Sequence, residues 1–153
     1  MRSMDIEEFL EREELTKATV AKRAMAFFID SILLAIIAVI IHFEAFEALS
    51  IHATVEAQLA FQSQVLTTYL PLAFIYQTLF VTLYGATVGK IVMKIRIIDL
   101  QTGATPQFGI ALNRSTVRII SEIIFNLGFL WAFFTPHLQA WHDLSARTIV
   151  IDA

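Results

Sequence analysis

The chain has 153 residues, of which 57% are hydrophobic and 16% charged, and its formal net charge is −3. A soluble domain carries roughly 45–50% apolar and about 25% charged residues, and a chain this short has too much surface to hide the excess. Part of the chain must therefore be surrounded by lipid. The acidic charge argues against a nucleic-acid partner. The absence of cysteine excludes disulfides, thiolate catalysis and cysteine-based zinc sites.

Residues 1–16 form an acidic segment ahead of the first apolar stretch. Its apolar residues fall near helical spacing, at Ile6, Phe9, Leu10 and Leu15. This pattern predicts an amphipathic helix in a cytoplasmic acidic tail, with a solvated tail that frays as the alternative. We expect the rest of the chain, 17–153, to form one membrane domain. The acidic lead and the interruption of the apolar run by Asp30 argue against a cleaved signal peptide.

Two apolar segments are long enough to cross a bilayer as helices. The first covers about residues 24–41 and follows three basic residues, and the second covers about 65–84. The loop between them, 42–64, has no lysine or arginine, whereas the loop after the second, 85–114, has four. By the positive-inside rule the N-terminus is cytoplasmic. We expect a multi-pass protein of the cell inner (plasma) membrane, because outer-membrane proteins are β-barrels.

A third hydrophobic segment, about 115–141, is long enough for one span but too short for two. Residues 91–100 have the β-branched content of a strand, and residues 147–152 closely resemble 95–100. A lone strand is unstable, so these two should pair like a small cytoplasmic β-hairpin. The third segment would then enter and leave on one side as a re-entrant hairpin that turns near Asn126–Gly128. The alternative is a plain third span with the tail outside.

The expected fold class is therefore an all-α membrane protein. Its helical bundle has two transmembrane helices plus a third spanning or re-entrant segment, and the paired strands form its only sheet. The lipid bilayer is the first expected partner. Three segments cannot enclose a transport pathway by themselves, so transport would require a homo-oligomer or another membrane protein.

Asp30 lies in the first apolar segment, about 10 Å deeper along a helix than Arg23. A carboxylate there costs on the order of 2.5–3.5 kcal/mol unless it is paired or protonated. One interpretation makes Asp30 an ion or proton site, helped by Glu122, and the other makes it a structural ion pair or hydrogen-bond anchor. Arg114, Arg118 and Glu122 recur every four residues and share one helix stripe. Either arginine is the expected counter-ion of Asp30, unless both extend to the lipid headgroups. Arg23, which shares a helix face with Asp30, is a further expected charge partner.

Motifs for catalysis or metal binding are not convincing. The stretch Gly85–Lys90 resembles a P-loop, but it is one residue too short and lacks the Ser or Thr that holds magnesium. His142 and Asp143 form a plausible hydrogen-bonded pair, but no nucleophile elbow accompanies them. We therefore expect no enzymatic activity, no metal and no cofactor.

Four stretches follow one another over about residues 17–152: RAMAFFID, GATVGK, IRIID and HDLSARTIV. Together they resemble the RDD family of small membrane proteins. The positions that carry the likeness are Arg23, Asp30, Gly85, Gly89, Lys90, Asp99, His142, Asp143 and Thr148. The family's arginine and first aspartate correspond to Arg23 and Asp30, and its second aspartate corresponds to Asp143. The resemblance implies transport, including sodium–proton exchange, as an expected function.

The sequence thus leaves two functions open. In the first, the chain is a transporter or a transporter component for a cation or proton, with Asp30 as the intramembrane charge. In the second, it is a non-transporting membrane scaffold or accessory subunit, whose Arg–Asp pairs fix the packing of the helices.

Overall fold

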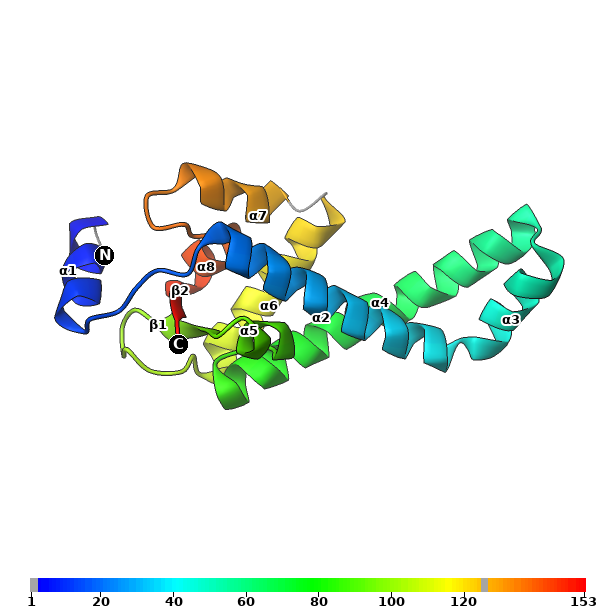
Figure 1. The fold of residues 1–153 in the computed structure, drawn as a ribbon, viewed down its shortest axis with the longest axis horizontal. Helices are drawn as coiled ribbons and strands as arrows, with labels where there is room; N and C mark the ends of the chain where they lie inside the picture. The colour runs from blue at the N-terminus through cyan, green and yellow to red at the C-terminus, as the bar shows by residue number, and fades with distance from the viewer. Residues whose placement is uncertain (1–2, 125–126) are drawn as a thin grey trace.

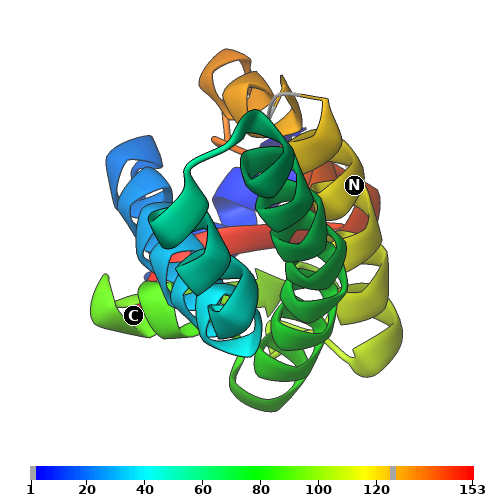
Figure 2. The same cartoon turned by 90° about the vertical axis from the view of Figure 1, so that its right-hand side faces the viewer.

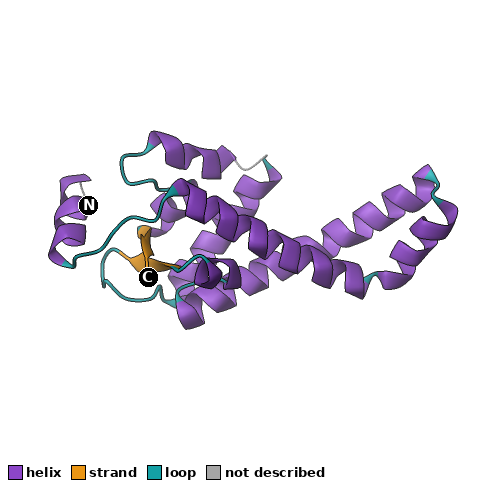
Figure 3. Cartoon of the chain, viewed as in Figure 1, coloured by secondary structure: helices purple, strands orange, loops and turns teal. Residues whose placement is uncertain are grey.

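The structure is a computed structural model that describes residues 3–124 and 127–153. Helices make up most of it, and the two strands form one small sheet (Figure 3). In chain order the elements are α1 (Ser3–Arg12), α2 (Val20–Ile41), α3 (Phe43–His52), α4 (Val55–Tyr84), α5 (Val88–Val92), β1 (Ile95–Asp99), α6 (Phe108–Ile123), α7 (Leu127–Leu130), η1 (Trp131–Phe134), α8 (Trp141–Ala146) and β2 (Thr148–Asp152). The predicted class of fold is confirmed.

Helix α2 begins at a cap formed by Thr19, whose hydroxyl accepts a hydrogen bond from the backbone N–H of Lys22 at 3.3 Å. Its buried residues are small or polar except Leu34, and most of its large apolar residues face outward: Asp30 is fully buried, whereas Phe28 is 59% exposed. This arrangement is typical of a membrane helix. Lipid is as apolar as leucine, so small residues that allow close helix approach face the neighbouring helices.

Helix α4 is also long and apolar enough to cross a membrane, as α2 is. It begins at Val55, ten residues before the apolar stretch predicted over 65–84, because Thr54 caps a first part that is less apolar. This first part of α4 and α3 form a helical hairpin at the end of the molecule far from the sheet (Figure 1). Most of the predicted loop 42–64 is therefore helical.

The third hydrophobic segment is bent and does not form one straight helix. Helix α6 meets the stretch Leu127–Phe134, which contains α7 and η1, at an angle of 108°. After the bend, α7 leads back toward the end of the molecule where the sheet lies (Figure 1). This shape differs from a plain straight span. Part of the turn expected near Asn126–Gly128 lies outside the described residues, since 125–126 are not described.

The sheet pairs the two predicted strands in antiparallel register, with Ile95 opposite Asp152 and Asp99 opposite Thr148. Residues 91 and 92 were expected in the first strand, but they belong to α5. The reason lies in tertiary contacts, because the N-terminal N–H groups of this helical turn donate hydrogen bonds to side chains of α2 and α4. β-branched content alone cannot reveal such support.

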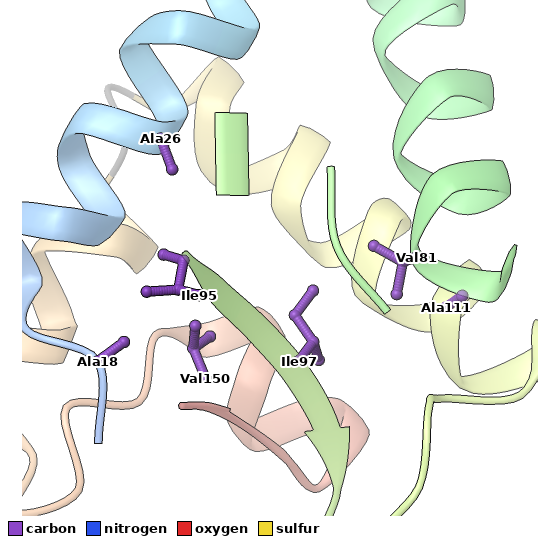
Figure 4. Packing of buried hydrophobic residues seen from close by; sticks show 7 residues of the cluster. All are labelled: Ala18, Ala26, Val81, Ile95, Ile97, Ala111 and Val150. Atoms are coloured by element: carbon purple, nitrogen blue, oxygen red, sulfur yellow. The ribbon is translucent and has the colours of Figure 1, made fainter. Parts of the chain in front are cut away.

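The core joins the sheet to the long helices. Helices α2, α4 and α6 lie side by side, with β2 behind them (Figure 2). On one face of the sheet, Ile95, Ile97 and Val150 pack with Ala26, Val81 and Ala111 from these three helices (Figure 4). The other face packs against α1 through Ile6 and Leu10. The N-terminal amphipathic segment is therefore a helix that covers the sheet.

Candidate functional site

Asp30 accepts three hydrogen bonds, from side chains and backbone of two other elements. The hydroxyl of Tyr76 in α4 donates to its Oδ1 at 2.7 Å, and the hydroxyl of Thr87 donates to its Oδ2 at 2.6 Å. The backbone N–H of Gly89 in α5 donates to Oδ1 at 2.8 Å. Tyr76 in turn accepts a hydrogen bond from the N–H of Val88 at 2.9 Å. The first turn of α5 is therefore capped by residues of the two long helices.

The turn that brings α5 to Asp30 depends on two glycines. Gly85 ends α4 with a left-handed backbone at φ +66°, a conformation that favours glycine. Gly89 lies directly against α2: a Cβ on this residue would be 2.1 Å from the carbonyl oxygen of Ala26. The spacing of the GATVGK motif therefore serves a chain reversal and a close helix contact.

Replacing Gly89 with alanine should destabilise the protein by roughly 1–3 kcal/mol, because the added methyl overlaps backbone that cannot move without displacing α2. The thermal unfolding midpoint in detergent measures this effect. Gly109→Ala is the matched control, since a Cβ at Gly109 meets nothing within 4 Å. Equal midpoints for the two variants would contradict the close contact between α5 and α2.

A second buried carboxylate, Asp143 at the start of α8, joins three helices. It accepts hydrogen bonds from the guanidinium of Arg23 in α2 and from the backbone N–H of Ala140, the latter at 2.9 Å. The guanidinium of Arg114 in α6 lies 2.6 Å from its other oxygen. Both arginine side chains are 5% exposed and Asp143 is 0% exposed. Arg23 also donates to the carbonyl oxygen of Leu138.

Burial and nearby charges determine the protonation states of Asp143 and His142 in α8. Burial by itself would raise the pKa of Asp143, but the guanidinium groups of Arg23 and Arg114 outweigh it and hold that pKa below its usual range. Burial also lowers the pKa of His142 well below its usual value, although Asp143 opposes this shift. Asp143 is therefore ionised and His142 neutral near pH 7.

The expected charge partners of Asp30 are placed elsewhere, and Arg23 pairs with Asp143. Arg114 pairs with Asp143, and the guanidinium of Arg118 lies over the ring of Phe27, 5.1 Å from its centroid. Within residues 3–124 and 127–153, Asp30 forms no ion pair. Hydroxyl and backbone N–H donors take the place of a cation. Neutral donors of this kind are hard to identify from sequence, because they carry no charge pattern.

Glu122 is separate from Asp30. It is half-buried and accepts a hydrogen bond from the hydroxyl of Tyr69 at 3.2 Å. The structure does not bring these two carboxylates together as one site.

The remaining motif positions support the local fold. Asp99 accepts hydrogen bonds from the N–H of Gln101 at 3.0 Å and from the hydroxyl of Thr102 at 3.1 Å, so it forms the turn after β1. Thr148 accepts a hydrogen bond from Arg114 and links the Asp143 cluster to β2. Tyr76 and Thr87 were missed at the sequence level, although Tyr76 is a polar group within an apolar segment and offered a signal.

The chain matches the model of the RDD family over residues 17–147. No match is found among curated proteins or among solved structures. The matched stretch contains Asp30 and Asp143 with all the partners described above, except Thr148. It also contains both long apolar helices and the bent third segment. The chain is therefore a membrane protein that belongs to the RDD family.

Proposed function

We propose that this protein is a non-transporting membrane scaffold or accessory subunit, in which Asp30 and Asp143 hold the helices together. The observation that carries this proposal is that protein groups occupy both carboxylates: donors bind both oxygens of Asp30, and Arg23 and Arg114 each pair with one oxygen of Asp143. A cation carried by either residue would have to displace these donors. As a scaffold, the protein would assemble with itself or with another membrane protein through its lipid-facing helices.

The donors of Asp30 suit a carboxylate acceptor within a bilayer. Hydrogen bonds to the ionised form of a carboxylate stabilise that form, and charge-assisted bonds are roughly twice as strong as neutral ones. Asp30 thereby connects α2 to α4 through Tyr76 and to α5 through Gly89. In the proposed orientation the N-terminus and the sheet lie on the cytoplasmic side of the plasma membrane, which the basic loop residues support.

Transport of a cation or proton through Asp30 is the second candidate, and one observation favours it. Thr87 donates to Asp30 and also accepts a hydrogen bond from the ammonium of Lys90 at 3.5 Å. The line Asp30–Thr87–Lys90 thus connects a buried carboxylate to a buried amine, and a proton could move along it. This candidate requires an oligomer or a partner to complete a pathway.

Asp30→Asn should lower the unfolding midpoint in detergent, because the amide nitrogen cannot accept from Thr87 or from Gly89. A loss of roughly 1–3 kcal/mol follows from leaving a buried donor unpaired. Glu122→Gln is the control, since its remaining carbonyl oxygen can still accept from the single donor Tyr69. Circular dichroism or a dye-based melt checks both variants.

The same proteins in proteoliposomes separate the two functions. As a scaffold, the unmodified protein produces no sodium–proton exchange above that of protein-free vesicles. Exchange by the unmodified protein that disappears in Asp30→Asn, with an unchanged unfolding midpoint, would establish the transport function and overturn the scaffold proposal.

A further inference from the structure

A small cavity of about 20 Å³ lies among α2, α5, α6, α7 and α8. Three of its lining residues are basic and none is acidic. The full lining consists of Arg23, Phe27, Lys90, Arg118, Ser121, Phe129 and His142. Of these residues, only Arg23 takes part in the proposed scaffold role, so that role does not explain the other residues of the cavity.

Two of the basic side chains have no carboxylate partner among the described residues. Arg118 forms no ion pair there and lies over Phe27. Lys90 is 7% exposed, and within residues 3–124 and 127–153 its ammonium has only the weak 3.5 Å contact with Thr87. An ammonium makes up to three hydrogen bonds, so Lys90 retains donors for another group.

The charges around the cavity do not balance. Three basic residues line it, Arg23, Lys90 and Arg118, and a fourth, Arg114, does not line it but shares Asp143 with Arg23. Three carboxylates lie on the same helices, Asp30, Asp143 and Glu122. With Lys90 protonated, one positive charge is therefore left over. An uncompensated charge in a buried or lipid-covered site is costly, and one monovalent anion would neutralise it.

His142 adds a second, independent observation. It lines the cavity, is 7% exposed, and its Nδ1 is buried without a hydrogen-bond partner in the described structure. Buried polar atoms are rarely left unsatisfied, and a bound ion or water is one explanation of an exception; of the five such atoms among the described residues, Nδ1 of His142 is the one that belongs to a residue lining this cavity. Ser121, which is 2% exposed, brings a hydroxyl to the same wall.

We propose that this cavity binds one monatomic anion, chloride in the cell, between the ammonium of Lys90, the guanidinium of Arg118 and the hydroxyl of Ser121. The size of the cavity selects the class of ligand. A volume near 20 Å³ accommodates about one water-sized particle, so a monatomic anion fits it better than a tetrahedral anion such as phosphate. The proposal stands independently of whether the protein is a scaffold or a transporter.

Two pairs of variants test the site in the purified full chain. The unfolding midpoint is measured in detergent while sodium chloride replaces sodium gluconate at constant ionic strength. Lys90→Met and Arg118→Gln each remove one cavity cation. Lys94→Met and Arg96→Gln remove exposed cations of the same types that do not line the cavity.

Chloride should raise the midpoint of the unmodified protein in a saturable manner, and gluconate should not. The apparent chloride affinity should fall roughly tenfold or more in Arg118→Gln and Lys90→Met, because each loses a charge-assisted contact, and should not change in the two controls. No chloride-specific rise, or the same rise in Arg118→Gln as in Arg96→Gln, would overturn the proposal. If Lys90→Met does not fold, the half-buried Arg118 still provides the comparison.

Anomalous diffraction from crystals of the unmodified protein grown in bromide tests the anion site without a variant. An anomalous peak within reach of Lys90, Arg118 and Ser121 supports the anion site. A cavity without such a peak at saturating bromide refutes it.

Discussion

Asp143→Ala should destabilise the protein by about 3–5 kcal/mol, the loss that follows when one partner of a buried ion pair is removed. The substitution leaves Arg23 and Arg114 buried together without a compensating charge. It also removes the acceptor for the N–H of Ala140 at the start of α8. Since net stabilities are commonly 5–15 kcal/mol, we expect a protein that is folded only at low temperature, if at all.

Asp152→Ala is the matched control for this experiment. Asp152 also pairs with a basic residue, Lys22 at 2.8 Å, but both side chains are about one-third exposed. Exposed pairs contribute roughly 0–1 kcal/mol, so this variant should melt close to the unmodified protein. Thermal melts of the three proteins in one detergent make the comparison. Similar midpoints for Asp143→Ala and Asp152→Ala would show that the Asp143 cluster does not determine stability.

Stability should rise with pH above about 7 in chloride-free buffer, because of Lys90. The pKa of Lys90 is lowered from 10.5 to about 7, mainly by burial and also by the nearby charges of Arg118, Arg114 and Arg23, while Asp30 opposes the shift. Between these two values the unfolded chain holds a proton that the folded protein has lost. Unfolding then takes up a proton, so the free energy of unfolding increases by up to about 1.4 kcal/mol per pH unit. Below the folded pKa both states are protonated and this contribution is constant.

The comparison of Lys90→Met with Lys94→Met isolates this contribution. Denaturant unfolding from pH 7 to 10 should give a flatter profile for Lys90→Met, whereas Lys94→Met should retain the slope. Chloride should also flatten the profile of the unmodified protein, because a bound anion keeps Lys90 protonated. The same slope in Lys90→Met as in the unmodified protein would show that the titrating group lies elsewhere.

The features of the fold that depend on local composition could be predicted from the sequence. Apolar length identified α2 and α4, and the likeness between residues 95–100 and 147–152 identified a strand pair far apart in the chain. The start of α4 was placed too late, because hydropathy marks where lipid begins and a helix can extend beyond it. The helical turn α5 was missed, because side chains of two other helices stabilise it.

The candidate site was predicted in part. Asp30 was identified because a carboxylate in an apolar segment requires compensation, and the structure supplies it through neutral donors. The spacing of the charges predicted Arg114 or Arg118 as the counter-ion of Asp30. However, the spacing of residues along one helix does not say which neighbouring helix their side chains face. Asp143 competes for Arg23 and Arg114 from a distant part of the sequence. Only the tertiary fold decides between two carboxylates.

The long separation between Arg23 and Asp143 constrains how the protein is made. The two residues are 120 positions apart, so Arg23 leaves the ribosome long before Asp143 has been synthesised. Arg23 precedes the apolar run of α2, and in the meantime its charge can remain among the lipid headgroups. The ion pair therefore forms at a late step of biogenesis, when α8 packs against helices that are already in the bilayer. A nascent chain that stops before Asp143 has Arg23 and Arg114 without the carboxylate that pairs with them.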